Sequence, residues 1–409
     1  MNQVQNNITL NDFREAFDAS PRSIDQLKSF EEFCKVGLPT HKLEEYRFTP
    51  VGKFLEANFD LAYYGQSPET KFNEPNQSEI VIYILNGRLA EISHAYTGLS
   101  IKQTERVSTI PSNDPFVLLN KAFNNQEIHI NIEANQDLKK TIKINHILDS
   151  EENQVMVNPR LVVTIAENAS VNIIETFSSS GINAVFSNIM AEYTLGENTK
   201  LNYYRLQDDA GTYQVYNSVV KQQGKSVINS FIFSFDGNVI RNNSIFSIEK
   251  EFCESNFFGL YLPTGKSLID NHTVADHKVP NCVSNELYKG IMNEQAKGVF
   301  NGKIFVRPNA QKTNAFQSNR NILLTDTATI NTKPQLEIWA DDVKCSHGCT
   351  TGQLNKEALF YLQSRGIDID DARTMLLSAF ASEVVNKIPD VELRAEIENI
   401  VSSRLTNAY

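Results

Sequence analysis

The sequence predicts a mainly β protein whose core is a solenoid, with a helical region at each end. Short runs rich in Val, Ile, Phe, Tyr and Thr begin near residue 80 and are separated by polar turns. Strand–turn–strand units recur through the middle of the chain, and apolar residues at helical spacing are confined to its two ends. We therefore divide the chain into an N-terminal helical region (1–78), a β-solenoid core (79–348) and a C-terminal helical domain (349–409).

Two runs of apolar residues predict helices in the N-terminal region. The first consists of Leu10, Phe13, Ala16 and Phe17, and the second of Ile24, Leu27, Phe30, Phe33 and Cys34. Both follow the period of an amphipathic helix. The next segment, LPTHKLEEYRFTPV (residues 38–51), is polar and bracketed by two prolines, so we interpret it as a turn and hinge.

Self-similarity in the core supports the solenoid. VTIAENASVNIIETF begins at Val163, and YTLGENTKLNYYRLQ begins 30 residues later at Tyr193, in register and without a gap. VVKQQGKSVINSFIF from Val219 and ILLTDTATINTKPQLEI from Ile322 have the same form, with spacings that shorten to 26 residues. Each unit buries its apolar face only against its neighbours, as stacked coils do. A β-sandwich or barrel of hairpins is the alternative.

Helical spacing returns after Gly348. We predict helices over 356–364 and 370–387 and a third that begins at Pro389, each with its apolar residues on one side. Such helices either dock a partner or cap the solenoid.

Charge and hydropathy exclude several classes of ligand. The chain has 38 Lys and Arg against 49 Asp and Glu, and this net charge of −11 disfavours nucleic acid or an anionic membrane as the main ligand. No apolar run approaches the roughly 18 residues of a membrane span, and the first residues lack the features of a secretory signal. We expect a cytoplasmic protein that binds neither nucleic acid nor membrane.

The segment DDVKCSHGCTTG contains the sharpest chemical motif. Five cysteines in so long a chain argue against a disulfide framework. Cys345, His347 and Cys349 alternate, so an extended strand places two thiols and an imidazole on one face. These donors suit iron, zinc or an iron–sulfur cluster, but neighbours on one face of a strand lie about 7 Å apart. We expect partial coordination that a partner chain completes; the alternative is a strand-to-helix junction with buried small residues.

A second segment, DNHTVADHKVPNC, contains weaker metal-ligand candidates, namely His272, His277 and Cys282, with Asp276 between the histidines. Their spacing matches neither H-x-x-x-H nor C-x-x-C. The alternative is that they are polar ladder and turn residues between coils.

A P-loop interpretation of Gly265-Lys266-Ser267 fails on spacing. Gly259 lies one residue too far upstream for the phosphate-binding pattern, Pro263 interrupts the loop, and the following residues are typical of a strand rather than a helix. We expect no nucleotide site there.

The motifs also resemble a known family. GKSLIDNHTVADHKVPNCVSNELYKG, GVFNGKIFV and QSNRNILLTDTATINTKPQLEIWADDVKCSHGCTTGQL are similar to the SufB/SufD family of iron–sulfur cluster assembly proteins. KLEEYRFTPV is similar to the signature that precedes the core of that family. Residues 318–324 lack the cysteine that SufB-like chains keep there, so the resemblance is greater to SufD than to SufB.

The resemblance implies a right-handed parallel β-helix between N-terminal and C-terminal helical regions. It implies a non-catalytic scaffold of the SUF complex, which pairs with SufB through the β-helix and binds the ATPase SufC, where ATP is hydrolysed, through its C-terminal helices. The residues that we expect at the SufC contact are Phe360, Tyr361, Arg365, Met375 and Phe380.

The resemblance also assigns the candidate site. His347 matches the SufD histidine implicated in cluster formation at the SufB interface, and Cys345 matches its neighbouring cysteine. A neutral imidazole is a good iron donor. Cys349 stands where some relatives have alanine, so we do not expect it to be essential. We expect no tightly bound cofactor in the isolated chain, and iron or a nascent iron–sulfur cluster to be shared with SufB.

Two other functions suit a β-helix. One is a polysaccharide-active enzyme, but such enzymes are usually exported and line a groove with Asp, Lys and Arg, whereas the motif-rich end here is rich in Asn, Cys and His. The other is a homodimeric metal-binding scaffold that acts without SufB.

Overall fold

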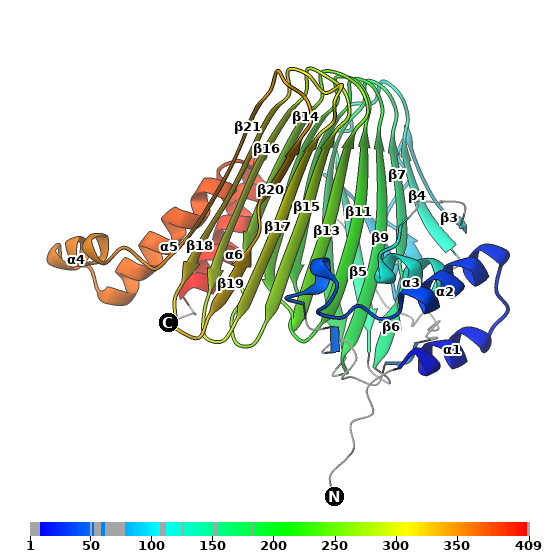
Figure 1. The fold of residues 1–409 in the computed structure, drawn as a ribbon, viewed down its shortest axis with the longest axis horizontal. Helices are drawn as coiled ribbons and strands as arrows, with labels where there is room; N and C mark the ends of the chain where they lie inside the picture. Colours follow the sequence, from blue (N-terminus) through cyan, green and yellow to red (C-terminus); the bar gives the residue numbers. More distant parts are fainter. Residues whose placement is uncertain are drawn as a thin grey trace, which may run out of the picture.

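A two-sheet β-solenoid forms the body of the protein (Figure 1). The computed structural model describes residues 9–49, 51–52, 59–61, 78–106, 112–124, 126–150, 154–181 and 183–406. No helix within these residues has the length and apolar character needed to cross a membrane.

From β7 to β19 successive strands alternate between two sheets, so each coil there contributes a strand to each. Sheet A contains, in spatial order, β19 (Thr329–Thr332), β17 (Lys297–Val306), β15 (Leu268–His277), β13 (Val239–Ile248), β11 (Tyr213–Gln222), β9 (Val185–Leu195), β7 (Arg160–Ile165), β4 (Gln126–Ile132) and β3 (Leu99–Glu105), with β20 (Gln335–Ile338) beside β17 and β6 (Val155–Val157) beside β9. Sheet B contains β2 (Arg88–Ile92), β1 (Glu79–Leu85), β5 (Thr141–Asp149), β8 (Ser170–Ser180), β10 (Lys200–Asp208), β12 (Val227–Asp236), β14 (Glu254–Tyr261), β16 (Val283–Met292), β18 (Asn314–Leu323) and β21 (Lys344–Gly352). Apart from β1–β2 and β3–β4, the strand pairs of the described residues are parallel, which confirms the solenoid and excludes the sandwich of hairpins.

The sequence repeat is the coil of the solenoid. Val163 of β7 pairs with Tyr193 of β9, as the 30-residue repeat predicts. The inward-facing column that they begin continues through each next strand of sheet A as Val220, Phe246, Ala275 and Ile304. All of these side chains lie in one buried cluster. The coils shorten as predicted, because Phe246 follows its register partner Val220 by 26 residues.

An asparagine ladder on the outer face of sheet B holds neighbouring coils in register. Each side-chain amide donates to the Oδ1 atom of the preceding asparagine at 2.8–3.0 Å. The ladder consists of Asn172, Asn202, Asn229, Asn256 and Asn285. Because each rung satisfies the next, the ladder fixes the stacking of the coils.

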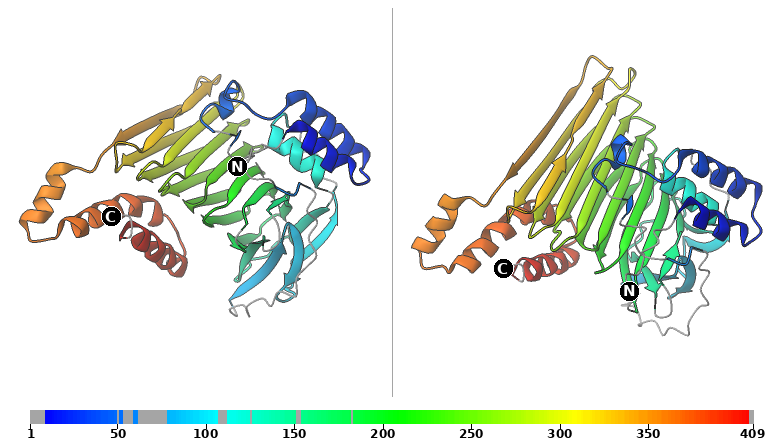
Figure 2. Two further views of the ribbon diagram at one scale, coloured as in Figure 1. Left: turned by 90° about the horizontal axis from the view of Figure 1, so that it is seen from below. Right: turned by 60° about the horizontal axis from the view of Figure 1, so that its bottom comes forward.

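Helices cover the two sheets at opposite ends of the solenoid (Figures 1 and 2). They are α1 (Leu10–Asp18), α2 (Ile24–Val36), the short 3₁₀ helix η1 (Glu44–Tyr46), α3 (Pro115–Phe123), α4 (Lys356–Ser364), α5 (Ile369–Val385) and α6 (Val391–Thr406). Phe13 and Phe17 of α1 pack with Phe123 of α3 in a cluster that also contains Phe186 of sheet A. Capping boxes begin α1 and α2.

The C-terminal helices cover sheet B. Leu377 and Val384 of α5 share a buried cluster with Phe231 and Leu260 of sheet B and with residues of α6. Helix α4 has no buried residue and projects from the body (Figure 2). The three helices lie within a residue or two of the predicted bounds, and β21 runs on to Gly352 before α4 begins.

Candidate functional site

The last coil leaves one edge of each sheet open. β21 ends sheet B and β19 ends sheet A, so no strand in the described part of the chain pairs with their outer edges. Such edges present unpaired N–H and C=O groups that another chain can bind. We call the surface formed by β19, β20 and β21 the open end of the solenoid.

Cys345, His347 and Cys349 lie on one face of β21, directed toward the lumen between the sheets. Their register partners in β18 are buried residues, Ala315, Gln317 and Asn319. Cys345 packs partly buried against the core, whereas His347 and Cys349 are exposed. The structure therefore brings the three side chains together at the open end.

The two thiols of β21 have different surroundings. Burial raises the pKa of the Cys345 thiol. Cys349 Sγ donates to Thr332 Oγ1 of β19 at 3.2 Å, across the mouth of the lumen. All five cysteines are free, and no three His, Cys, Asp or Glu side chains of the described residues are arranged to hold a metal ion. The strand thus offers donor atoms without enclosing an ion by itself.

Glu286 of β16 and Gln317 of β18 lie beneath His347 in the same column of side chains. Gln317 Nε2 donates to Glu286 Oε2 at 2.6 Å. Burial raises the pKa of Glu286 to about 7. Sequence reasoning missed both residues, because their alignment under His347 depends on the lengths of two coils and no local motif marks it.

The structure does not bring His272, His277 and Cys282 together. His272 lies on the outer face of β15, where its Nε2 atom is 2.8 Å from Asp270 Oδ1. His277 points inward, with Nε2 2.9 Å from Ser284 Oγ, and burial lowers the pKa of its imidazole to about 4. Cys282 is buried at a turn. Each thus has a structural environment of its own.

The turn at 265–267 does not cradle a phosphate. The Gly265 N–H donates to Glu294 Oε2 at 2.6 Å, so a carboxylate of the next coil occupies its donor. The chain then enters β15 rather than a helix. The turn and the strand that follows it therefore differ from the loop and helix of a P-loop.

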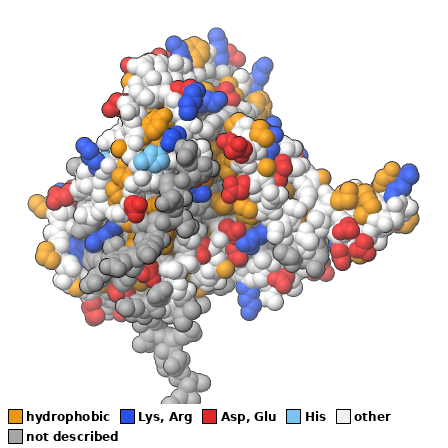
Figure 3. Space-filling model, turned by 180° about the vertical axis from the view of Figure 1, so that it is seen from behind, with side chains coloured by type: hydrophobic (Ala, Val, Ile, Leu, Met, Phe, Trp, Pro, Cys, Tyr) orange, Lys and Arg blue, Asp and Glu red, His pale blue; other side chains and the backbone are white. Residues whose placement is uncertain are grey.

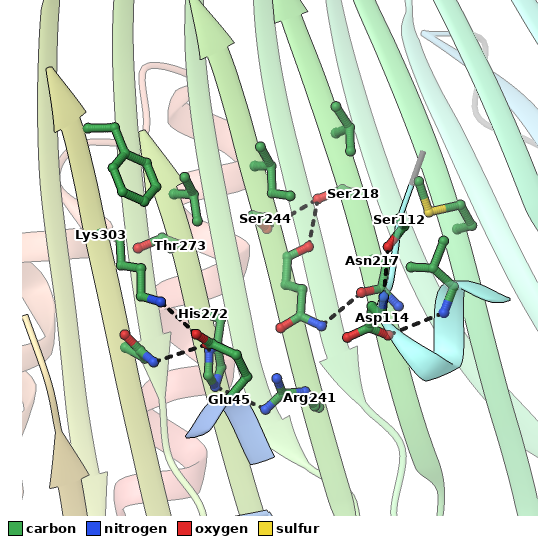
Figure 4. Close-up of a pocket in the computed structure, with 18 residues that line it drawn as sticks. Glu45, Ser112, Asp114, Asn217, Ser218, Arg241, Ser244, His272, Thr273 and Lys303 are labelled. Atoms are coloured by element: carbon green, nitrogen blue, oxygen red, sulfur yellow. Dashed lines mark hydrogen bonds and ion pairs between the residues drawn. The ribbon is translucent and has the colours of Figure 1, made fainter. Parts of the chain in front are cut away.

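The N-terminal segment makes a second polar cluster on the outer face of sheet A (Figure 4). Glu45 of η1 accepts a hydrogen bond from Lys303 Nζ at 2.5 Å and lies 3.3 Å from His272 Nδ1. The hydrogen bond from His272, aided by Lys303, holds the pKa of Glu45 at about 2. Beside them, Asp270 pairs with the buried guanidinium of Arg241. We predicted only a turn and hinge here, and KLEEYRFTPV, which provides Glu45, is the local string that could have pointed to this cluster.

A cavity of about 260 Å³ lies between this cluster and the start of α3. Val219, Ile245 and Val274 of sheet A line it. Glu45 and Asp114 line it from the N-terminal segment and from the start of α3. The carboxylates and cations on its rim already pair with one another or with Tyr46.

The predicted docking residues of the C-terminal helices fall into two groups. Three are exposed, by 72%, 58% and 50%, namely Phe360, Tyr361 and Met375. The Arg365 guanidinium lies 5.3 Å from the Tyr361 ring. Helix α4 forms an arm that projects from the body, and hydrophobic side chains are visible along this arm in Figure 3. Phe380 instead packs partly buried against the cluster between α5 and sheet B, with Lys289 Nζ 4.2 Å from its ring.

Comparison with known proteins connects this architecture to one family. The family model described as SUF system FeS cluster assembly, SufBD core domain, matches residues 146–380. An iron–sulfur cluster assembly SufBD family protein of Synechocystis is 31% identical over 90% of this chain and 87% of its own length. The iron–sulfur cluster assembly protein SufD of Escherichia coli is 27% identical over 95% of this chain and 94% of its own length. The chloroplastic protein ABCI7 of Arabidopsis thaliana is 27% identical over 96% of this chain and 89% of its own length. The matched core spans the strands from β5 to β21 that carry the candidate site, and the chain belongs to the SufBD family of SUF iron–sulfur cluster assembly proteins, with SufD among its relatives.

Proposed function

We propose that this chain is a non-catalytic scaffold subunit of a cytoplasmic SUF complex. It pairs with SufB at the open end of its solenoid and binds the SufC ATPase through its C-terminal helices. Iron or a nascent cluster, as the cargo, is bound between the two solenoids by His347, with Cys345 as a second donor from this chain.

The observation that carries this proposal is the position of His347. The imidazole is exposed on a strand whose outer edge pairs with no strand of the described residues, so a partner strand added there would lie directly beside it. Cys345, on the same face, is partly buried and reaches the interface from the core side. Soft donors that do not enclose an ion are suited to a site that two chains complete.

The exposed arm supports the second contact. Phe360 and Tyr361 are large hydrophobic side chains at the far end of the molecule from α1 and α2. Large exposed apolar side chains on a projecting helix are typical of an interaction surface. Phe380 contributes to this contact by anchoring α5 to sheet B rather than by touching the partner.

Coexpression with the SufB and SufC proteins of the same organism tests the proposal. We expect size-exclusion chromatography with mass detection to give a complex of SufB, SufC and this chain. A chain that elutes alone, or as a homodimer in the presence of both partners, would contradict it. The homodimer would favour a scaffold that acts without SufB, because the open end can also pair with a second copy.

A further inference from the structure

The column of lumen-facing residues in sheet B changes its chemistry toward the open end. On successive strands β14, β16, β18 and β21, the residues in register are Phe257, Glu286, Gln317 and His347. The column is apolar at Phe257 and then presents a carboxyl, an amide and an imidazole. These three groups occupy consecutive rungs, which are separated by about 4.8 Å in a sheet.

The two inner groups are buried but incompletely bonded. Glu286 is 6% exposed and Gln317 is 3% exposed. Their mutual hydrogen bond uses Gln317 Nε2 and Glu286 Oε2. Glu286 Oε1 and Gln317 Oε1 make no hydrogen bond of normal geometry among the described residues, although the Thr273 hydroxyl of the facing sheet lies close enough to Glu286 to lower its pKa. Buried oxygens normally have partners, because an unpaired one carries its full desolvation cost. Two such oxygens on hydrogen-bonded neighbours point to a ligand that attracts oxygen lone pairs.

The facing wall makes room for this pair and closes the lumen beneath it. Gly302 of β17 lies opposite, and a Cβ atom there would be 2.1 Å from Gln317 Nε2. One rung below Glu286, Phe257 stacks on Phe246 of sheet A with ring centroids 3.8 Å apart. The polar pair is therefore bounded by aromatic rings on one side and followed by exposed His347 on the other.

We propose that Glu286, Gln317 and His347 form a binding site for one divalent transition-metal ion at the mouth of the solenoid. The donor set is a carboxylate oxygen, an amide oxygen and an imidazole nitrogen. Such a set suits Fe²⁺, Mn²⁺ or Co²⁺. It does not provide the thiolates that ligate an iron–sulfur cluster. Use of the two Oε1 atoms leaves the hydrogen bond between Gln317 and Glu286 in place.

This inference rests on the proposed function only for the choice of iron as the natural ion. It gives the cargo a position on this chain alone, before any partner is bound. The proposed function places iron at the interface, whereas the two additional ligands lie inside the solenoid.

Cobalt titration of the isolated full-length chain tests the site. Co²⁺ alone is added without oxygen, with calorimetry for affinity and stoichiometry and visible absorption for the ligand type. We expect one ion per chain and at least a tenfold loss of affinity in Glu286→Gln and in His347→Ala. Glu337→Gln, an exposed carboxylate near the open end, is the matched control and should leave affinity unchanged. Melting curves with and without Co²⁺ verify that each variant folds.

Two results would overturn the inference. One is that wild type binds no Co²⁺ in the micromolar range. The other is that Glu286→Gln binds it as wild type does, with a thiolate-to-cobalt charge-transfer band, which would assign the ion to Cys345 and Cys349 instead. Coelution with SufB and SufC is measured separately. A chain that binds Co²⁺ but elutes alone would contradict the proposed function and leave the metal site standing.

Discussion

Arg241 and Asp270 form an ion pair that is buried beneath the N-terminal segment, with side-chain exposures of 1% and 0%. Thr49 donates a hydrogen bond to Asp270, and the Arg241 guanidinium lies 4.1 Å from the ring of Tyr46. The segment that carries the family-like KLEEYRFTPV string is thus held on sheet A by two charges from the solenoid. The pair links a local motif to the fold of the core.

Replacing Asp270 by Asn should strongly destabilise the protein. The Arg241 charge would remain buried without its counter-ion, which typically costs about 3–5 kcal/mol. Urea unfolding followed by circular dichroism measures the change. Asp276→Asn is the control on the same strand, because its partner Arg307 is 41% exposed and such a pair contributes at most about 1 kcal/mol. Equal losses in both variants would contradict the assigned role of burial.

His277 should make stability depend on pH between about 6.5 and 4. Burial lowers the pKa of His277 to about 4 in the folded state, whereas the unfolded chain binds this proton near pH 6.5. As the pH falls through this window the unfolded state takes up a proton that the folded state does not. The stabilisation is therefore complete above pH 6.5 and is lost toward pH 4, by about 3 kcal/mol at most.

The measurement is the free energy of unfolding of wild type and His277→Gln at pH 7 and at pH 4.5. We expect the variant to lose less stability than wild type between these values. His41→Gln changes an exposed histidine and should retain the wild-type dependence. An identical pH dependence in His277→Gln and wild type would show that this imidazole does not contribute.

The sequence was sufficient to predict the coils and the helices at the two ends of the chain, but not α3, which lies within the segment predicted as solenoid. Val163 and Tyr193 pair as the repeat predicts, because the apolar period and the turn residues recur in both units. The alternation of Cys345, His347 and Cys349 also needs only the period of a strand. These features depend on residues close together in the chain.

Contacts between coils could not be predicted in the same way. Glu286 and Gln317 lie beneath His347 only because of the lengths of the intervening turns, and coil length varies along the solenoid. A change of one residue in a turn would direct Glu286 to the opposite face of its sheet. In the sequence alone, Arg241 and Asp270 are likewise ordinary charged residues of two strands. Their pairing and burial follow only from the register of those strands and from the position of the N-terminal segment.

Replacing Gly259 by a residue with a side chain should destabilise the protein, whereas the same replacement at Gly348 should not. A Cβ atom at Gly259 would lie 2.2 Å from the Tyr288 ring on the next strand, whereas one at Gly348 would have no atom of the described residues within 4 Å. We expect Gly259→Ala to cost about 1–3 kcal/mol, as overpacking in a core does. Gly348→Ala should be close to neutral. Thermal unfolding of the two variants compares them directly, and a neutral Gly259→Ala would show that Tyr288 can move aside.

His347→Ala should preserve the fold and reduce the cargo. The side chain is exposed on the terminal strand, so its removal should change stability by no more than about 0.5 kcal/mol. In the complex assembled with SufB and SufC, iron and acid-labile sulfide should fall well below wild type. Lys344→Ala, exposed on the same strand, is the control. Unchanged iron and sulfide in His347→Ala would refute the assignment of this imidazole.

The contact with SufC is best tested by point variants, because deletion of residues 353–409 would also uncover sheet B. Leu377 and Val384 cover Phe231, so a truncated chain would expose a large apolar surface and aggregate for reasons unrelated to docking. Phe360→Ala combined with Tyr361→Ala avoids this, since both side chains are exposed and α4 has no buried residue. We expect at least a tenfold loss of affinity for SufC in a pull-down titration, with an unchanged melting temperature. Val391→Ala removes an equally exposed side chain from α6 and should bind as wild type does. Retained SufC binding in the double variant would move the contact away from the arm and onto α5 or α6.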